Sequence, residues 1–288
     1  MKARAASAIA LLRETWTAYQ GHNAQWLAAA LAYFAAFAVA PLIIVLVEVA
    51  GFVVHNHQHV LDVVFGYMQR DVGAGSGAVK QIVAATFNQP RKSVTAQAVG
   101  WAVFIFAAIG LFTALQFALN TVWDATNRSG GLLQTLLQRI TGFAMMLAVA
   151  LLLLLSVFAN AALTTAAGYL TNLFAGLATL LKVADFLSTS ALVCVLFALL
   201  FRYLPNARIA WRDVWLGAGL TAVLFTIGQF LLGWYLGRAG VTSVYGAFGS
   251  LVAFLLWANY TAQIFLLGAE FTHVYALRHG TLRVANRT

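Results

Sequence analysis

The sequence predicts an all-α, polytopic membrane protein with six transmembrane helices and two short amphipathic helices between the first and the second. Hydrophobic residues make up 62% of its 288 positions and charged residues only 9%, whereas a soluble domain carries about 25% charged residues. Six apolar stretches are each long enough to cross the hydrocarbon core, which takes roughly 20 helical residues. Nearly all charges fall between these stretches, so lipid must cover most of the surface.

Residues 1–26 predict a cytoplasmic helix that lies at the membrane interface. Their apolar run, residues 5–12, ends at Arg13 and Glu14. It is too short for a spanning helix and does not fit a cleaved signal peptide. Trp16 and Tyr19 follow it and suit the headgroup level, where aromatic side chains gather.

The six spans are expected to form one bundle over residues 27–275, and residues 276–288 a basic cytoplasmic tail. The expected spans are residues 27–54, 94–119, 140–165, 183–203, 214–237 and 248–275. The second of them is the clearest, because it contains no Asp, Glu, Lys or Arg.

The connection at residues 55–93 is the one sizeable extramembrane segment that we expect. Apolar residues recur at helical spacing over residues 60–68 and again over residues 79–87, and a glycine-rich stretch at residues 73–77 separates them. This pattern predicts two short amphipathic helices that lie on the outer, periplasmic leaflet.

The Lys and Arg residues predict the orientation. Eleven of the seventeen lie in the N-terminus, the second and fourth connections and the C-terminus. Because cytoplasmic segments are enriched in Lys and Arg, both termini are expected in the cytoplasm of a bacterial inner membrane. The same residues account for the formal net charge of +9, so we expect contact with anionic lipid headgroups and not with nucleic acid.

The first span carries a carboxylate. Tyr33, Pro41 and Glu48 share a helix face at 100° per residue, and a proline inside a helix frees a backbone carbonyl. Glu48 then either lines an outward-facing cavity as a protonatable or cation-binding residue, or forms a hydrogen bond to a neighbouring helix near the interface.

The last span carries a second carboxylate, Glu270, near its inner end. Asn259, Gln263 and Glu270 form a narrow stripe on one face, which we expect to point into the bundle. Lipid contact is assigned to Leu256, Phe265 and Leu266. Arg202, at the inner end of the fourth span, is the expected structural ion-pair partner of Glu270.

Other spans also carry polar stripes, which include Gln116 and Asn120 on the second and Asn160 on the third. Such residues either join helices or line a polar cavity within the bundle. The glycine pairs Gly233 with Gly237 and Gly217 with Gly219 predict close helix packing in the fifth span.

Enzyme chemistry is poorly represented. The sequence contains no GxSxG, HExxH, GxxxxGK[ST] or CxxC motif, and its eight acidic residues are scattered. We therefore expect no enzyme activity, no catalytic residues, no metal site and no cofactor.

Several motifs together resemble the YihY/BrkB family of bacterial inner-membrane proteins. They are LAAALAYF at 27–34, APL at 40–42, LQFALNTVW at 115–123, RYLPN at 202–206, YGAFGS at 245–250, LW at 256–257 and LGAE at 267–270. The resemblance implies six spans with both termini in the cytoplasm. It also implies a role linked to serum resistance or envelope lipid homeostasis. An old label as a tRNA-processing ribonuclease is at odds with the missing nuclease residues.

The leading functional hypothesis is a transporter-like protein that moves or accommodates an amphipathic or lipid substrate through a polar-lined bundle. The alternative is a non-transporting scaffold that organises envelope machinery through residues 55–93. A second copy of the chain and an envelope protein are the protein partners that the sequence leaves open.

The cavity hypothesis makes a prediction for two polar positions. Glu48→Gln and Asn160→Ala should impair transport or lipid-linked phenotypes while membrane abundance is unchanged, because each removes one polar group from the proposed lining. Phenotype assays with quantified membrane levels measure this, and full activity in both variants would remove the argument for a cavity.

Overall fold

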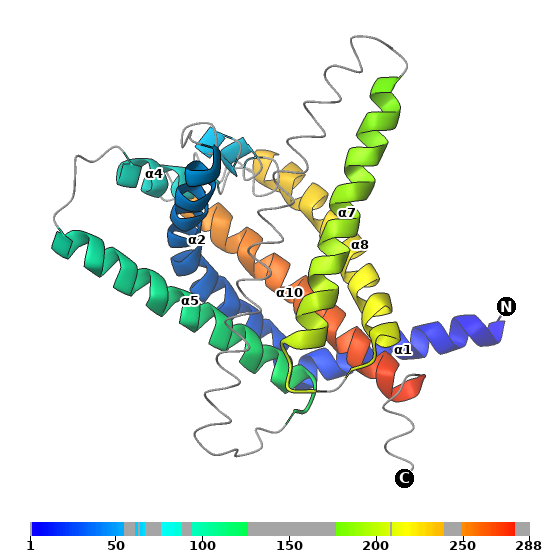
Figure 1. Cartoon of the computed structure of the whole chain (residues 1–288). Helices are drawn as coiled ribbons and strands as arrows, with labels where there is room; N and C mark the ends of the chain where they lie inside the picture. Colours follow the sequence, from blue (N-terminus) through cyan, green and yellow to red (C-terminus); the bar gives the residue numbers. More distant parts are fainter. Residues whose placement is uncertain are drawn as a thin grey trace.

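The computed structural model describes residues 2–54, 61–62, 64–66, 69, 76–87, 94–125, 177–207, 209–238 and 249–279. Within these ranges every regular element is helical, which confirms the predicted all-α class there. The helices are α1 (Lys2–Gly21), α2 (Ala24–Val54), α4 (Ser76–Phe87), α5 (Val94–Val122), α7 (Leu177–Tyr203), α8 (Trp211–Arg238) and α10 (Gly249–Arg278) (Figure 1).

Five of the predicted spans coincide with α2, α5, α7, α8 and α10. Segments long and apolar enough to cross a membrane occupy Phe186–Tyr203, Trp211–Tyr235 and Gly249–Arg278, and shorter apolar segments occupy Ala24–Val39 and Phe106–Val122. The predicted third span, residues 140–165, lies outside the described residues. Six spans in total therefore stays a prediction.

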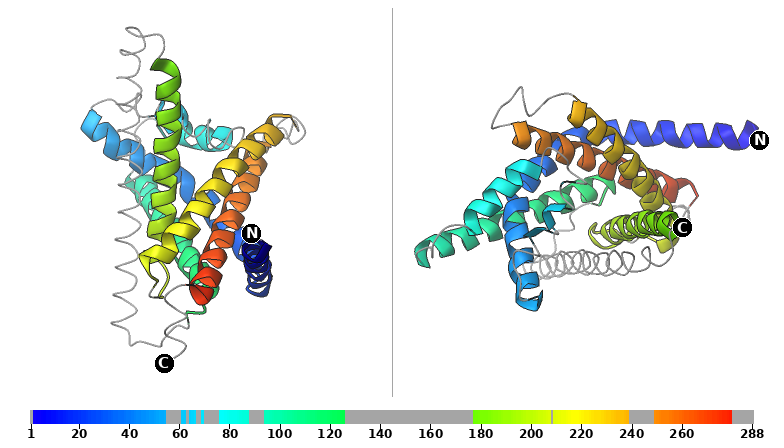
Figure 2. Two further views of the ribbon diagram at one scale, coloured as in Figure 1. Left: turned by 90° about the vertical axis from the view of Figure 1, so that its right-hand side faces the viewer. Right: turned by 90° about the horizontal axis from the view of Figure 1, so that it is seen from above.

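Helix α10 lies at the centre of the described bundle. It packs against α8, α2, α1, α4 and α5, and Figures 1 and 2 show it crossing between them. Phe265 and Leu266 are buried there, and the Phe265 ring lies 5.2 Å from that of Phe201 on α7. Their assignment to lipid was therefore wrong, because a helix surrounded by other helices buries apolar side chains on several faces. Leu256 is exposed, as expected.

Helices α8 and α10 approach each other through two reciprocal glycine–threonine contacts. A Cβ atom on Gly217 would lie 1.6 Å from Thr272 Oγ1, and one on Gly268 would lie 1.8 Å from Thr221 Oγ1. Each threonine hydroxyl donates to the carbonyl four residues earlier in its own helix, at 2.7 Å. The hydroxyls are thus satisfied internally, and the absent glycine side chains let the two helices touch.

The glycine predictions for this helix are met unevenly. Gly217 makes the close contact that was expected, whereas none of the described residues lies within 4 Å of a Cβ built on Gly219 or Gly233. Gly228, which the sequence did not single out, packs against the Tyr260 ring of α10. Small-residue spacing alone does not reveal which face of a helix meets its neighbour.

Helix α4 packs inward. Its Val79 and Val83 are buried together with Ile43 of α2 and Phe254 of α10. The expectation that the amphipathic segment rests its apolar face on the leaflet is corrected for α4, because that face covers α2 and α10. Part of the first predicted amphipathic helix, residues 60, 63, 67 and 68, lies outside the described residues, while residues 61–62, 64–66 and 69 are helical.

Segments far apart in the sequence meet at one end of the bundle. Arg278 at the end of α10 contacts Glu14 of α1, and the backbone N–H of Asn206 in the α7–α8 turn donates to Asn120 Oδ1 of α5 at 2.8 Å. These are the segments that the charge count grouped on one side. Figure 1 shows α1 crossing this end, where α5, α7 and α10 finish.

The two glycines of α8 support a matched stability prediction. Gly217→Ala should lower the free energy of unfolding by about 1–3 kcal/mol, the usual cost of overpacking. Gly219→Ala, two residues away and clear of every described side chain, should be neutral or stabilising by up to about 1 kcal/mol, since alanine favours helix. Thermal unfolding in detergent micelles measures both, and equal effects would contradict the close contact.

Candidate functional site

Two helix ends create the candidate site. Helix α1 stops at Gly21, and Asn23 follows with a φ of 52°, a left-handed conformation that asparagine tolerates. Helix α5 stops at Val122, and Asp124 has a φ of 47°. The Asp124 and Ala125 N–H groups donate back to the carbonyls of Thr121 and Asn120, the pattern of a Schellman cap.

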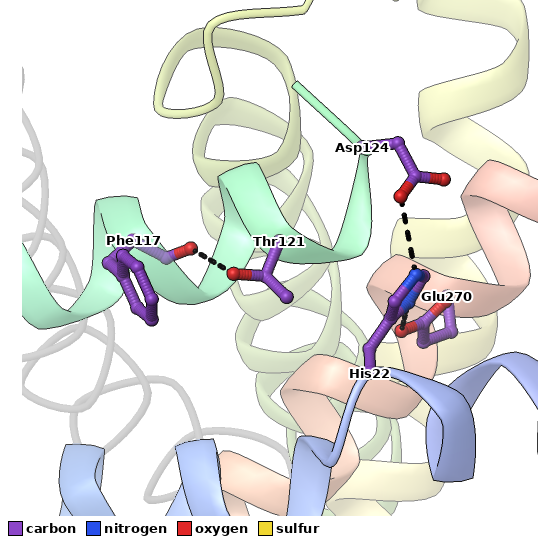
Figure 3. A network of polar contacts seen from close by, with 5 residues as sticks. All are labelled: His22, Phe117, Thr121, Asp124 and Glu270. Atoms are coloured by element: carbon purple, nitrogen blue, oxygen red, sulfur yellow. Dashed lines mark hydrogen bonds and ion pairs between the residues drawn. The ribbon is translucent and has the colours of Figure 1, made fainter. Parts of the chain in front are cut away.

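These ends place His22 and Asp124 beside Glu270 of α10. His22 Nδ1 lies 2.7 Å from Glu270 Oε1, and His22 Nε2 lies 3.5 Å from Asp124 Oδ1. Figure 3 shows the imidazole between the two carboxylates. Exposure falls along the series, from 73% for Asp124 through 22% for His22 to 0% for Glu270, so the three side chains lead from the surface into the bundle.

The protonation state of the His22 ring determines how many carboxylates it can donate to. Both nitrogens of an imidazole are donors only in the imidazolium form, so the protonated ring satisfies both carboxylates at once. A buried carboxylate is costly unless it is paired and hydrogen-bonded, and His22 supplies that partner. Nearby, burial and then the negative charge of Glu270 raise the pKa of the Tyr19 phenol above its ordinary value.

This geometry favours proton transfer over metal binding. The two carboxylates contact opposite nitrogens of one ring, so the three groups do not converge on a common point. Among the described residues, no group of three or more His, Cys, Asp or Glu side chains is placed to hold a metal ion.

The structure gives Arg202 and Glu270 different partners. Arg202 donates to the backbone carbonyl of Ile209 and so closes the α7–α8 turn, while Glu270 is bonded to His22. The sequence placed both residues near the same end of the bundle, but depth in the membrane does not determine which neighbour a side chain reaches.

Polar residues of the predicted stripes mainly contact each other or a nearby turn. Gln263 Nε2 donates to Asn259 Oδ1 at 2.5 Å within α10. Asn120 holds the α7–α8 turn through Asn206, and Gln116 is half-buried one turn earlier. Tyr33 is exposed, with its ring 4.9 Å from that of Phe37.

Three predicted positions cannot be placed further. Pro41 and Glu48 lie within α2, which continues through them as one helix, but their side chains are outside the described set. Asn160 lies outside the described residues altogether.

His22 and Asp124 are the site residues that sequence reasoning missed in these roles. His22 lies in the short Gly21–Asn23 turn, outside every predicted span, and its partner is 248 residues away. The usable signal was the histidine–asparagine pair between two helices, next to the inner end of a span that carries a carboxylate. Asp124 follows Gln116 and Asn120 at the same four-residue spacing, so the sequence shows it only as the end of a polar stripe.

Comparison with known proteins gives a family. The sequence model of the virulence factor BrkB family matches residues 15–288. A UPF0761 membrane protein of Azotobacter vinelandii is 33% identical over 262 residues, which cover 90% of this chain and 60% of that protein. One of Pseudomonas aeruginosa is 30% identical over 248 residues, covering 84% and 57%.

The chain therefore spans about 60% of the length of these relatives or less. A UPF0761 membrane protein of Ralstonia nicotianae is 30% identical over 187 residues, which cover 64% of this chain and 40% of that protein. No solved structure matches.

The site predicts unequal effects for two histidines. His22→Ala should lower the free energy of unfolding by about 3 kcal/mol, because it leaves the buried carboxylate of Glu270 without its partner. His279→Ala, at an exposed histidine at the end of α10, should change it by no more than about 0.5 kcal/mol. Denaturant or thermal unfolding in micelles measures both.

A second substitution tests the cause. Adding Glu270→Gln to His22→Ala removes the uncompensated charge, so the double variant should recover part of the lost stability. A double variant that is less stable than His22→Ala would show that the charge is not the source of the loss.

Proposed function

This chain belongs to the virulence factor BrkB family of membrane proteins, and we propose that it is a transporter-like protein for an amphipathic, lipid-class substrate. In this proposal, protonation of the His22–Glu270 pair changes the charge of the contact while the substrate moves through the bundle. The proposal places the chain in the bacterial inner membrane with both termini in the cytoplasm, where its basic residues contact anionic headgroups.

The carrying observation is the fully buried carboxylate of Glu270, bonded to a histidine that also contacts an exposed aspartate. Ionisable residues within spanning helices are costly to keep and commonly mark ion paths and proton relays. A purely structural contact would not need a graded route from the surface. The series Asp124, His22, Glu270 provides such a route.

The proton steps balance without a further reactant. A hydronium ion on the Asp124 side gives a proton to His22 Nε2 and leaves a water molecule, and the ring becomes an imidazolium. The Nδ1 proton can then pass to Glu270 Oε1 over 2.7 Å. An imidazolium and a carboxylate thereby become a neutral imidazole and a neutral carboxyl group. The neutral pair is less costly to bury and holds α1 and α10 together less strongly, since a charge-assisted bond has become a neutral one.

A change in that bond can alter the bundle because the contact joins separate elements. His22 belongs to the α1–α2 turn and Glu270 to the central helix α10. A proton shifts the balance between two arrangements only if it stabilises them differently. The charged and neutral forms of this pair meet that condition, and substrate movement is the proposed consequence.

The second candidate function is a scaffold that binds envelope machinery through residues 55–93. It draws on the packing of α4, which buries Val79 and Val83 and leaves Lys80 and Gln81 exposed. A polar outer face on a helix held against the bundle suits a protein partner.

Transport is tested with purified protein in phosphatidylethanolamine–phosphatidylglycerol vesicles that contain a fluorescent phospholipid. Loss of the fluorophore to an impermeant quencher measures movement between leaflets. The wild-type chain should speed this movement over empty vesicles. Glu270→Gln should reduce the increase about tenfold, because a charge-assisted hydrogen bond is worth roughly 1.5–3 kcal/mol. Glu14→Gln, the same change at an exposed carboxylate, should retain it.

Equal rates in wild-type and empty vesicles would contradict the transporter proposal. Deleting residues 76–87 separates the two candidates in cells. If the chain is a scaffold, this deletion should remove the crosslinks to its partner, and the lipid-linked phenotype should be lost together with them. In that case Glu270→Gln should leave the crosslinks intact.

A further inference from the structure

Three buried polar atoms beside the His22–Glu270 pair lack a hydrogen-bond partner within the part of the chain that is described. They are Glu270 Oε2, His273 Nδ1 and Trp123 Nε1. All three residues are more than nine-tenths buried. Buried polar atoms are nearly always satisfied by protein or by water, so three of them in one place need an explanation.

The three side chains are neighbours. Glu270 and His273 are separated by three residues on α10, which puts them on one face with their Cβ atoms about 5–6 Å apart. The Trp123 ring, just after α5, lies 5.0 Å from the His273 ring at an interplanar angle of 44°. Each of the three atoms therefore lies where α5 ends against α10.

The chemistry of these groups determines their roles. Glu270 Oε1 is bonded to His22, and among the described residues Oε2 is left to accept a further hydrogen bond. A neutral imidazole has one donor and one acceptor nitrogen, and we assign the proton of His273 to Nε2, so that Nδ1 carries a lone pair. Trp123 Nε1–H is a donor only.

We infer that Glu270, His273 and Trp123 form a binding site for one water molecule, and that His273 is the next proton acceptor after Glu270. A metal cation would meet the indole N–H and be repelled by it. A water molecule can accept from Trp123 and donate to both Glu270 Oε2 and His273 Nδ1. A buried water typically makes about three such bonds.

This inference rests on the proposed function for the origin of the proton and extends its path. Protonated Glu270 turns its carboxyl group so that Oε2 carries the proton and donates it to the water. The water passes one of its own protons to His273 Nδ1. The products are a Glu270 carboxylate, an unchanged water and a His273 imidazolium. The titratable groups that act on this pair from the packed elements are Tyr19, His22 and Asp124.

The site is tested by infrared difference spectroscopy of the full chain in lipid nanodiscs, recorded between alkaline and acidic buffer in ordinary and ¹⁸O-labelled water. The wild-type spectrum should contain a carboxyl C=O band that Glu270→Gln abolishes. It should also contain a water O–H band that shifts on ¹⁸O labelling. Trp123→Phe removes the indole donor and keeps an aromatic ring, and it should abolish the ¹⁸O-sensitive band and move the carboxyl band to higher frequency.

Trp257→Phe is the matched control. Trp257 Nε1 likewise finds no partner in the described part of the chain, but the ring packs against the separate cluster of α2, α4 and α10. This variant should leave both bands unchanged. His273→Gln, which keeps a polar side chain, should retain the ¹⁸O-sensitive band and lose the imidazolium ring modes. Thermal unfolding confirms that each variant is folded.

Two results would overturn the inference. One is a wild-type spectrum without an ¹⁸O-sensitive band, and the other is a band that survives Trp123→Phe. These outcomes are independent of lipid movement. A chain that fails to move lipid but shows the predicted bands would disprove the transporter proposal alone, and the reverse pattern would disprove the water site alone.

Discussion

The hydrogen bond between His22 and Glu270 is the constraint on which the arrangement of this protein depends. A carboxylate with no exposed surface sits in the helix that most of the others surround. Its burial is tolerable only because a histidine reaches it. That histidine lies in a turn of a few residues, so the ends of α1 and α2 must both stand against α10. The Glu270 side chain of α10 therefore constrains the position of the N-terminal helix α1.

The contacts of α8 and of Glu270 occupy opposite faces of α10. Thr221 and Thr272 each fill the space above a glycine of the opposite helix, so the backbones of α8 and α10 approach closely along the face that carries Gly268 and Thr272. Glu270 lies two residues from each of these positions, which turns its side chain to the other side of the helix. There it meets His22 of the α1–α2 turn. Because both faces are covered, α10 is buried on two sides and its carboxylate depends on a protein partner.

The helices of this chain could be predicted from hydropathy because lipid selects for length and apolarity, and both are visible in a single sequence. The side of α10 that faces its neighbours could not be predicted in this way, because Phe265, which lies among helices, and Leu256, which lies at the surface, are equally apolar. The partner of Glu270 could not be predicted from the sequence for another reason. His22 belongs to a polar turn, and only the fold brings it to a residue 248 positions away. The inward packing of α4 was hidden because an amphipathic face suits a lipid leaflet and a helix bundle alike.

The Schellman cap that ends α5 has an electrostatic consequence. A helix carries the equivalent of about half a negative charge at its carboxyl end. Helix α1 ends one residue before His22, and α5 ends two residues before Asp124, whose side chain contacts His22. Two helix ends therefore add negative partial charge near the carboxylates of Asp124 and Glu270. In a chain with a formal net charge of +9, the backbone thus adds to the attraction that these two side chains exert on a nearby cation.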